Sequence, residues 1–464
     1  MTIKNVAVID IGKTNVKLTL VRLNDLNEID ILTQPNDVLP GPPWPHYNVE
    51  SHWVFLLNGL HNFQKLHGID AISVTTHGAC IALLDNMGNL VAPILDYEHT
   101  GPDEFEVEYN KIRPSFSETG SPRLPMGLNV GAQLYWMFSK DRELKAKTAS
   151  IVTYPQYWGH RLTGVAATDL TSLGCHTDLW DPYSRKTSSL AEKLGVSAKI
   201  ANTISSHDIL GVILPEIAYQ TGIDPDTPVY CGIHDSNASL LPHVINQPGS
   251  FSVVSSGTWV IVMSIGGKQP DLDPSKDLLI NVNAFGDPVP TARFMGGREY
   301  ELLIGEKTIE PTDKEIEIVL LEQSMLLPAV VKETGPFGGR KSNWLGDEPS
   351  IGSNKRSVAT GFYLALVTAH CLGLIGHMGP VIIEGPFAKN RCYCMMLASV
   401  TGCEVRAMNG ETGTSQGAAM LCAKDLSFFV EGSSVIFTPG NSLDKLFKSY
   451  SKVWKESLTV TGSY

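Results

Sequence analysis

The sequence predicts an α/β protein built from two similar domains. Residues 6–21 read VAVIDIGKTNVKLTLV, and two β-branched apolar runs flanking a short polar turn are typical of a β-hairpin. Residues 251–265, FSVVSSGTWVIVMSI, repeat this pattern about half a chain later. A chain of 464 residues with 43% hydrophobic content is long enough for two domains with separate cores. We expect these domains at 1–246 and 247–464.

Composition narrows the possible partners to small molecules. The formal charge is −12 and Lys and Arg are not clustered, which argues against binding nucleic acid or an anionic membrane. The apolar stretch 361–378 contains two histidines, so we interpret it as a buried helix rather than a membrane span. Eight cysteines lack the spacing of a disulfide framework or zinc site, and no export signal is visible, which predicts a cytoplasmic protein.

The polar turn of the first hairpin has the composition of an anion site. Gly12 allows a tight turn that brings backbone N–H groups close to an anion, and Thr14 adds a hydroxyl donor. Asp10, at the end of the preceding strand, is suited to holding hydrated Mg²⁺. Gly257 and Thr258 repeat the arrangement in the second hairpin. An ordinary surface hairpin is the alternative for either turn alone, and the pairing favours phosphate.

Two polar clusters in the first half are candidates for substrate binding. His77 and Gly78 end the predicted strand 71–79, where α/β sheets usually bind ligands, although a structural histidine is equally compatible. Asp96 and Glu98 follow a predicted strand led by proline, and their carboxylates suit the hydroxyls of a polyol. A solvated acidic loop is the alternative for this second cluster.

Residues 229–240 run from a predicted strand into a helix and place Asp235 near the helix N-terminus. That aspartate fits the ordinary role of an N-cap. Gly232 and His234 leave room beside it for a ligand.

In the second half, two helix entries are rich in small residues. Residues 382–390 form a predicted strand that ends in a Gly-Pro turn before a helix, and residues 413–420 enter another helix. Such entries suit a nucleotide base and ribose. Aromatic and apolar residues at helical spacing over 443–454 predict a final amphipathic helix that docks on the body of the protein, with the N-terminal domain as one candidate surface.

Taken together, these segments resemble the FGGY family of carbohydrate kinases, whose members have two ribonuclease-H-like domains of the actin and Hsp70 superfamily with a cleft between them. The similar segments are the first phosphate loop at 10–17, the catalytic-aspartate segment at 232–236, the second phosphate loop at 255–259, the adenosine loop at 385–390, and the helix entry beside the adenine at 414–419. Within the family, residues 14–17, 75–78 and 234–236 are more similar to L-fuculose and L-rhamnulose kinases. Pro386 departs from the usual second glycine of the adenosine loop.

The resemblance implies ATP-dependent phosphorylation of a sugar hydroxyl, with Asp235 as the general base and Asp10 holding Mg²⁺. The implied nucleotide-binding residues are Gly12, Lys13, Thr14, Asn15, Gly257, Thr258, Gly385, Phe387, Asn390, Gly413 and Gln416. The implied sugar-binding residues are His77, Gly78, Asp96, Glu98, His234 and Asp235.

The expected substrate is a 6-deoxyketohexose of the L-fuculose or L-rhamnulose type, used in carbohydrate catabolism. A ketopentose of the xylulose or ribulose type is the alternative, because one methyl group in a pocket is worth only about 1–3 kcal/mol. A catalytically silent sugar or nucleotide sensor on the same fold is the alternative of another class. A homodimer is the candidate assembly.

Overall fold

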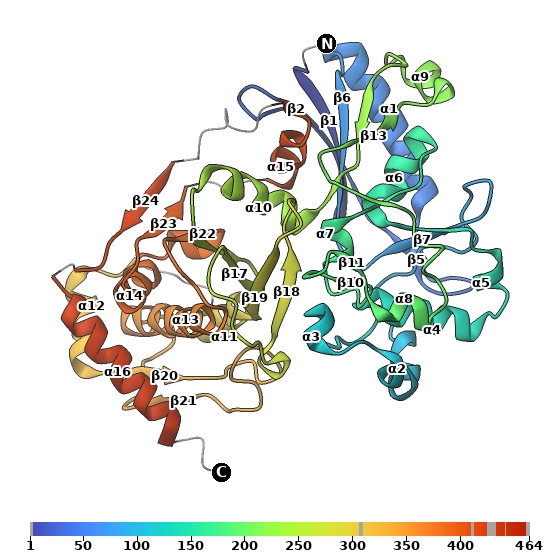
Figure 1. Cartoon of the computed structure of the whole chain (residues 1–464). Helices are drawn as coiled ribbons and strands as arrows, with labels where there is room; N and C mark the ends of the chain where they lie inside the picture. Colours follow the sequence, from blue (N-terminus) through green and yellow to red (C-terminus); the bar gives the residue numbers. More distant parts are fainter. Residues whose placement is uncertain (1–2, 306–309, 410–412, 425–432, 441, 461–464) are drawn as a thin grey trace. The chain divides into compact units, whose positions relative to one another are not determined.

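The computed structural model describes residues 3–305, 310–409, 413–424, 433–440 and 442–460. The chain divides into two compact units, and each unit has a mixed sheet packed with helices (Figure 1). The first unit comprises Met1–Asn246, Ile280–Pro288 and Thr412–Glu431, and the second comprises Gln247–Leu279, Val289–Glu411 and Gly432–Tyr464.

The sheet of the first unit has the strand order β13-β14-β6-β1-β2-β3, with β15 also paired to β6. Its strands are β1 (Asn5–Ile11), β2 (Asn15–Arg22), β3 (Asn27–Pro35), β6 (Ala71–Thr76), β13 (Ile209–Val212), β14 (Pro228–Tyr230) and β15 (Ile233–His234). Strand β1 is antiparallel to β2 and parallel to β6. The parallel strands β6 and β15 bring residues 77 and 235, the first beyond each strand, to the same edge of the sheet.

Both faces of this sheet are covered, which explains the nearly continuous apolar run of β1. The covering helices are α1 (Val49–His67), α6 (Tyr154–Thr163), α10 (Asp235–Asn246) and α15 (Thr414–Met420). Ala7 and Ile9 belong to the core formed with α1 and α6, whereas Val6 and Val8 belong to the core formed with α10 and α15. Because side chains alternate along a strand, Asp10 lies on the same face as Val6 and Val8. That face is the one covered by α15.

Shorter elements build the rest of the first unit. They are β4 (Val38–Leu39), β5 (His46–Tyr47), β7 (Ile81–Leu84), η1 (Gly101–Phe105), α2 (Glu106–Ile112), α3 (Phe116–Thr119), α4 (Val130–Lys140), α5 (Leu144–Lys147), β8 (Ser150–Thr153), β9 (Thr168–Asp169), α7 (Leu170–Leu173), β10 (Trp180–Asp181), β11 (Lys186–Thr187), α8 (Ser189–Lys193), β12 (Thr203–Ile204) and α9 (Pro215–Thr221). The α6 helix ends at Gly164, which adopts the left-handed conformation of a helix C-cap.

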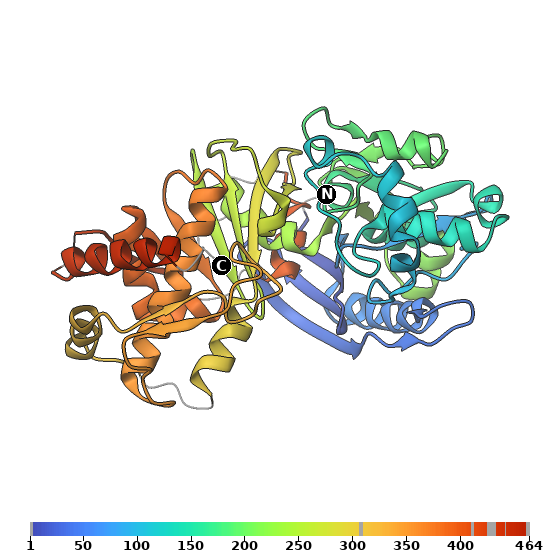
Figure 2. The same ribbon diagram turned by 90° about the horizontal axis from the view of Figure 1, so that it is seen from below.

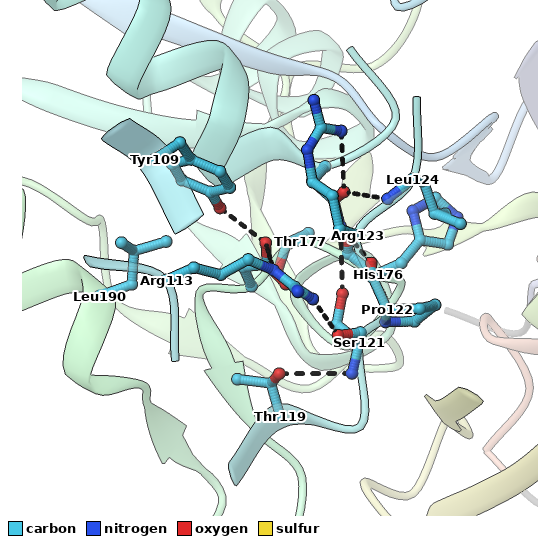
Figure 3. Close-up of polar contacts among 12 residues, drawn as sticks. Tyr109, Arg113, Thr119, Ser121, Pro122, Arg123, Leu124, His176, Thr177 and Leu190 are labelled. Carbon is cyan, nitrogen blue, oxygen red and sulfur yellow. Dashed lines mark hydrogen bonds and ion pairs between the residues drawn. The ribbon is translucent and has the colours of Figure 1, made fainter. Parts of the chain in front are cut away.

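A network of buried polar side chains joins the loops that follow α3 and α7 (Figure 3). Asp178 accepts hydrogen bonds from the Tyr109 hydroxyl at 2.6 Å and from Arg113 Nε at 2.8 Å. The Asn129 side-chain amide donates to the His176 carbonyl at 2.9 Å. The loops are therefore held by internal partners, as buried polar groups require.

The sheet of the second unit has the strand order β18-β19-β17-β16-β22-β23-β24. Its strands are β16 (Phe251–Ser256), β17 (Val260–Ile265), β18 (Leu278–Val282), β19 (Pro288–Phe294), β22 (Val381–Glu384), β23 (Val405–Met408) and β24 (Ser434–Phe437). Strand β16 is antiparallel to β17 and parallel to β22, which repeats the pairing of β1 with β2 and β6. The turn between β18 and β19 is grouped with the first unit.

The other elements of the second unit surround a long central helix. They are η2 (Pro274–Lys276), α11 (Gly296–Ile304), α12 (Asp313–Glu322), β20 (Met325–Leu327), β21 (Asn343–Leu345), α13 (Asn354–Leu374), η3 (Pro386–Lys389), α14 (Arg391–Thr401) and α16 (Asp444–Val460). The α13 helix is long and apolar enough to cross a membrane, but 78% of its apolar window is buried in protein. The final helix α16, red in Figure 2, packs on α12, α14 and β20 of the same unit.

Both predicted hairpins, the buried helix at 361–378 and the final amphipathic helix are confirmed. The strand predicted before Asp96 is wrong. Leu95 makes only an isolated bridge to His46, and the chain then turns so that the His99 N–H donates to the Asp96 carbonyl at 3.0 Å. The turn satisfies backbone groups that a strand would have paired across a sheet.

Candidate active site

The tip between β1 and β2 is a tight, exposed turn. Gly12 N donates to the Asn15 carbonyl at 2.9 Å, and a Cβ atom at Gly12 would lie only 3.2 Å from that oxygen. Asn36 supports the tip from β3's end, donating from its side chain to the Gly12 carbonyl at 2.7 Å and from its backbone to the Thr14 carbonyl at 2.9 Å. The side chains of Thr14 and Asn15 remain exposed. The turn therefore presents these predicted phosphate residues on a rigid support.

Asp10 lies beneath this tip and is nearly buried, with 6% of its surface exposed. Its Oδ2 accepts a hydrogen bond from Thr414 Oγ1 of α15 at 2.8 Å. Burial raises the pKa of Asp10, the hydrogen bond from Thr414 opposes that rise, and the charge of Asp235 adds to it. A cation would relieve the repulsion between these two carboxylates.

The donor set fits a metal held mainly through water. Within the described parts of the chain, no group of three or more His, Cys, Asp or Glu side chains is arranged to hold a metal ion. Mg²⁺ keeps several waters and is commonly held by one or two carboxylates together with substrate phosphates. The Asp10 carboxylate is compatible with that mode of binding.

Asp235 begins α10, at the edge of the sheet where β6 and β15 end. Its Oδ1 accepts hydrogen bonds from Ser236 N at 2.6 Å and Ser236 Oγ at 3.3 Å. An N-cap side chain instead accepts from the residue two or three positions later, so these contacts differ from the N-cap alternative. Burial raises the pKa of Asp235, an effect opposed by His77 and by the bonds from Ser236. With 29% of its side chain exposed, the carboxylate remains accessible to a ligand.

His234 positions the Asp235 carboxylate from the other side. Its Nε2 lies 3.1 Å from Asp235 Oδ1, and the Asn237 side-chain amide lies 3.4 Å from its Nδ1. Because the amide donates to Nδ1, we assign the ring proton to Nε2, which faces Asp235 Oδ1 and also lies 3.6 Å from Cys175 Sγ. Burial lowers the pKa of His234 to about 4, so the ring is neutral near pH 7. A Cβ atom at Gly78 would lie 2.8 Å from Nε2, which explains the glycine there.

The backbone of His234 is held by two residues that sequence reasoning did not assign to the site. His234 N donates to Thr171 Oγ1 at 3.0 Å, and Thr171 Oγ1 donates in turn to Asp169 Oδ2 at 2.5 Å. Asp169 caps α7 through the N–H groups of Thr171 and Ser172. Both residues lie in the polar stretch 169–182, which ends in a proline. Such a composition predicts a turn but does not identify the residues that the turn contacts.

His77 lies among three tyrosines. Its ring centroid is 5.2 Å from those of Tyr47 and Tyr154 and 5.3 Å from that of Tyr97. Its Nδ1 donates to the Gly78 carbonyl at 2.9 Å, whereas its buried Nε2 has no hydrogen-bond partner among the described residues. Burial lowers the pKa of His77 to about 4, so Nε2 is a free acceptor at neutral pH. An unpaired buried acceptor of this kind suits a ligand hydroxyl.

Lys13 lies next to the acidic residues Asp96 and Glu98 in the first unit. Lys13 Nζ forms an ion pair with Asp96 Oδ1 and lies 3.2 Å from Glu98 Oε2. The predicted phosphate-binding lysine and the predicted sugar-binding acids are therefore in direct contact.

In the second unit, the tip between β16 and β17 is joined to the segment after β22. Gly257 N donates to the Trp259 carbonyl at 2.9 Å, which closes the tip that carries Thr258. Phe387 N donates to Ser256 Oγ at 3.0 Å. Gly385 has φ of 78°, and a Cβ there would lie 2.0 Å from the Ser256 carbonyl oxygen. The second tip and the predicted adenosine loop thus form one structure.

A cavity of about 420 Å³ lies beside this loop. That volume falls within the range of about 300–1,000 Å³ typical of small-molecule sites. The cavity is lined by Tyr300, Glu310, Pro311, Ser357, Pro386, Phe387, Lys389, Asn390, Arg391 and Cys392. Asn390 also caps α14, accepting a hydrogen bond from Tyr393 N at 3.1 Å. Two of the predicted nucleotide residues, Phe387 and Asn390, therefore line a cavity of suitable size.

Gly413 and Gln416 lie at the start of α15, in the first unit. Gly413 N donates to Gln416 Oε1 at 3.3 Å, which caps the helix. The next residue, Thr414, is the one that contacts Asp10. The sequence analysis included Thr414 only in the helix entry 414–419, because nothing local in the sequence indicates a contact with the first strand.

Comparisons with known proteins agree with this arrangement. Residues 5–242 match the N-terminal domain of the FGGY family of carbohydrate kinases, and residues 248–428 match the description "Carbohydrate kinase FGGY, C-terminal domain". A carbohydrate kinase from Novosphingobium aromaticivorans is 35% identical with a TM-score of 0.90, covering 97% of this chain and 99% of that one. The predicted fold, two α/β domains of the actin-like ATPase type, is confirmed.

Curated relatives match over shorter lengths. Xylulose kinase of Bacillus subtilis is 24% identical over 64% of this chain and 62% of its own length. L-Fuculokinase of Escherichia coli K12 is 28% identical over 42% of this chain and 41% of its own length. The matches thus span about two fifths to three fifths of those relatives. From the two domain matches and the similarity over nearly all of its length, the chain belongs to the FGGY family of carbohydrate kinases.

Proposed function

We propose that this protein transfers the γ-phosphoryl group of ATP to a hydroxyl of a ketose, of the 6-deoxyketohexose class represented by L-fuculose and L-rhamnulose. The observation that carries the proposal is the Asp235 carboxylate, which is hydrogen-bonded to Ser236 at an accessible sheet edge, lies 3.1 Å from His234 Nε2, and is close enough to Asp10 for their charges to interact. All eight cysteines are free thiols, which supports work in the reducing cytoplasm.

In the proposed reaction, Asp235 accepts the proton of the sugar hydroxyl as its oxygen attacks the γ-phosphorus. The bond between that phosphorus and the β,γ-bridging oxygen breaks, and ADP leaves. A carboxylate is a sufficient base because phosphoryl transfer gains mostly from positioning and charge neutralisation. His234 orients the carboxylate, and the raised pKa of Asp235 improves its ability to take a proton near neutral pH.

We assign the adenosine to the cavity beside Phe387 and Asn390, and the phosphates to the glycine tips that carry Thr14 and Thr258. Asp10 is the residue we assign to Mg²⁺, whose chemistry would be to neutralise polyphosphate charge. Thr414 would keep the Asp10 carboxylate ionised and oriented.

The test is ADP formation by the purified protein with Mg-ATP and a panel of ketoses. The panel contains L-fuculose, L-rhamnulose, D-xylulose, L-xylulose, D-ribulose and L-ribulose. Preference for a 6-deoxyketohexose supports the proposal. Preference for a ketopentose would instead identify a ketopentose kinase, and binding without ADP formation would identify a catalytically silent sensor.

The base assignment is tested by Asp235→Asn. The variant should lose sugar-dependent ADP formation by about 10²–10⁴-fold while still binding ADP in a calorimetric titration. Asp226→Asn is the matched control, because Asp226 is an exposed aspartate of the same unit. Retention of more than about a tenth of activity by Asp235→Asn would refute its role as base.

A further inference from the structure

Lys13 is enclosed by carboxylates and aromatic rings. Besides its ion pair with Asp96 and its 3.2 Å approach to Glu98, its ammonium lies 4.8 Å from the ring centroid of Tyr97 and 5.3 Å from that of Tyr47. Cations are attracted to aromatic faces at such distances. These four groups around the Lys13 ammonium come from the segments at 47 and 96–98.

Tyr47, Asp96 and Tyr97 also lie next to one another around His77. The Tyr47 hydroxyl donates to Asp96 Oδ1, the oxygen that also receives Lys13, at 3.1 Å. Tyr47 and Tyr97 both contact the His77 ring. Tyr47 and Tyr97 thus contact both Lys13 and His77, whose Nε2 is unpaired among the described residues.

Moving the ammonium to a phosphate would leave Asp96 buried beside a second carboxylate. The Asp96 side chain is only 11% exposed, so it would lose its main compensating charge in a poorly solvated place. An ammonium has three N–H donors; one is donated to Asp96, and Glu98 lies within ion-pair distance. A further N–H donor is available to a ligand, because 24% of the Lys13 side chain is exposed.

We propose that Lys13 belongs to the sugar-binding site and not to the phosphate-binding site. With Asp96 and Glu98 it forms a charged clamp that binds the hydroxyls of an uncharged polyol. The inference rests on the proposed function and deepens it by assigning a specificity residue and a substrate charge.

The charges around the clamp support a neutral substrate. Asp96, Glu98 and Asp235 carry negative charge, and Lys13 is already engaged by two of them. Burial lowers the pKa values of His77 and His234 to about 4, so neither ring offers positive charge near pH 7. A sugar acid such as gluconate would meet net repulsion from these groups of the first unit.

The first experiment separates the two ligands of the enzyme. In Lys13→Met, the KM for the best ketose of the panel should rise about 10- to 100-fold, as expected when a hydrogen bond to a charged group is lost. The dissociation constant for ADP, measured by calorimetry, should stay within about twofold. Lys4→Met, which removes an exposed lysine just before β1, is the matched control and should change neither value. Weaker ADP binding by about tenfold or more would overturn the inference, because phosphate contacts have that magnitude.

A double-mutant cycle with Asp96→Asn tests whether the two residues act as one clamp. Asparagine keeps an oxygen that can accept from the Tyr47 hydroxyl. The double variant should raise the ketose KM by less than the product of the two single effects, and its Tm should exceed that of Lys13→Met because the uncompensated carboxylate is gone. A double-variant KM equal to the product of the two single effects would refute the clamp. Turnover of D-gluconate by the wild type with a kcat/KM equal to that of the ketose would refute the charge argument.

The outcomes can be separated from those of the proposed function. Calorimetry with ADP does not require turnover, so it tests whether Lys13 binds phosphate even where no ketose of the panel is phosphorylated. Activity retained in Asp235→Asn would remove the proposed base and leave the ADP result for Lys13→Met intact.

Discussion

Thr414 Oγ1 donates a hydrogen bond to Asp10 Oδ2 over 2.8 Å, although 404 positions separate the two residues along the chain. The contact arises because α15 covers the face of the first sheet on which Asp10 lies. Burial raises the pKa of Asp10, and this hydrogen bond is the largest effect that opposes the rise. The α15 helix, late in the chain, therefore contributes a contact to the carboxylate at the end of the first strand.

Thr414→Val should weaken the Mg²⁺ binding that we propose for Asp10. Without the hydrogen bond, the pKa of Asp10 rises further and protons compete better with the metal. We expect the Mg²⁺ concentration for half-maximal ADP formation to rise about 2- to 10-fold at pH 7, with a larger effect at pH 6. Thr414→Ser, which keeps the hydroxyl, is the control. An unchanged Mg²⁺ titration would show that Thr414 does not act through Asp10.

Thr171 is expected to position His234 and the proposed base Asp235 without touching substrate. Its buried hydroxyl accepts from His234 N and donates to Asp169, so Thr171→Val removes the acceptor of His234 N. Asp169 Oδ2 loses one hydrogen bond and keeps those from Thr171 N and Ser206 Oγ. We expect kcat to fall about tenfold or more while the dissociation constant for ADP is unchanged. Thr171→Ser should recover most of kcat. A loss of Tm with normal kcat in Thr171→Val would instead indicate a purely structural residue.

The activity should decline in acid with an apparent pKa above that of an ordinary aspartate. Asp235 must be ionised to accept a proton, and burial raises its pKa, with His77 and Ser236 opposing. The acid limb of kcat should therefore lie above about pH 4, the usual pKa of an aspartate. A kcat that stays constant down to pH 4 would contradict this assignment.

The same shift has the opposite consequence for stability. A carboxyl whose folded pKa is raised stabilises the folded state below its unfolded pKa, and that contribution is lost as the pH rises through the folded pKa. Asp235→Asn should therefore raise the Tm at pH 7 and have little effect near pH 3. Each kcal/mol should appear as roughly 2–4 °C in a unit of this size. A lower Tm for the variant at pH 7 would indicate that the contacts to His234 and Ser236 outweigh burial.

The sequence predicted those parts of the structure that depend on local pattern. The hairpins at Asn5–Arg22 and 251–265 were predictable because alternation and turn residues act over a few positions. Partners of individual side chains were not, since Lys13 meets Asp96 across 83 positions and Asp10 meets Thr414 across 404. Such contacts depend on how helices and loops pack on the sheet, which no short window of sequence contains.

The strand predicted before Asp96 shows how local reasoning fails. Apolar residues there pack into the core, as predicted for a strand, but the Asp96 side chain accepts from Glu98 N at 3.2 Å and favours a turn. In this turn, the Asp96 carboxylate also accepts hydrogen bonds from Lys13 Nζ and the Tyr47 hydroxyl.

Replacing Arg113, in the polar network of Figure 3, should lower the free energy of unfolding strongly. Asp178 has a fully buried side chain, and its ion pair with Arg113 is 14% exposed on the arginine side. Arg113→Met leaves that carboxylate uncompensated, so we expect a loss of about 3–5 kcal/mol in unfolding free energy by denaturant titration. The control is Arg185→Met, because the pair of Arg185 with Asp287 is 52% and 57% exposed and should be worth less than about 1 kcal/mol.

The double variant Arg113→Met with Asp178→Asn tests the cause of that loss. Removing the charge of Asp178 should restore part of the stability, because the penalty comes from an unpaired buried carboxylate and not from a missing contact. Asparagine can still accept the hydrogen bond that the Tyr109 hydroxyl gives to Asp178 at 2.6 Å. A double variant less stable than Arg113→Met would mean that packing around the guanidinium, rather than charge compensation, determines the stability of these loops.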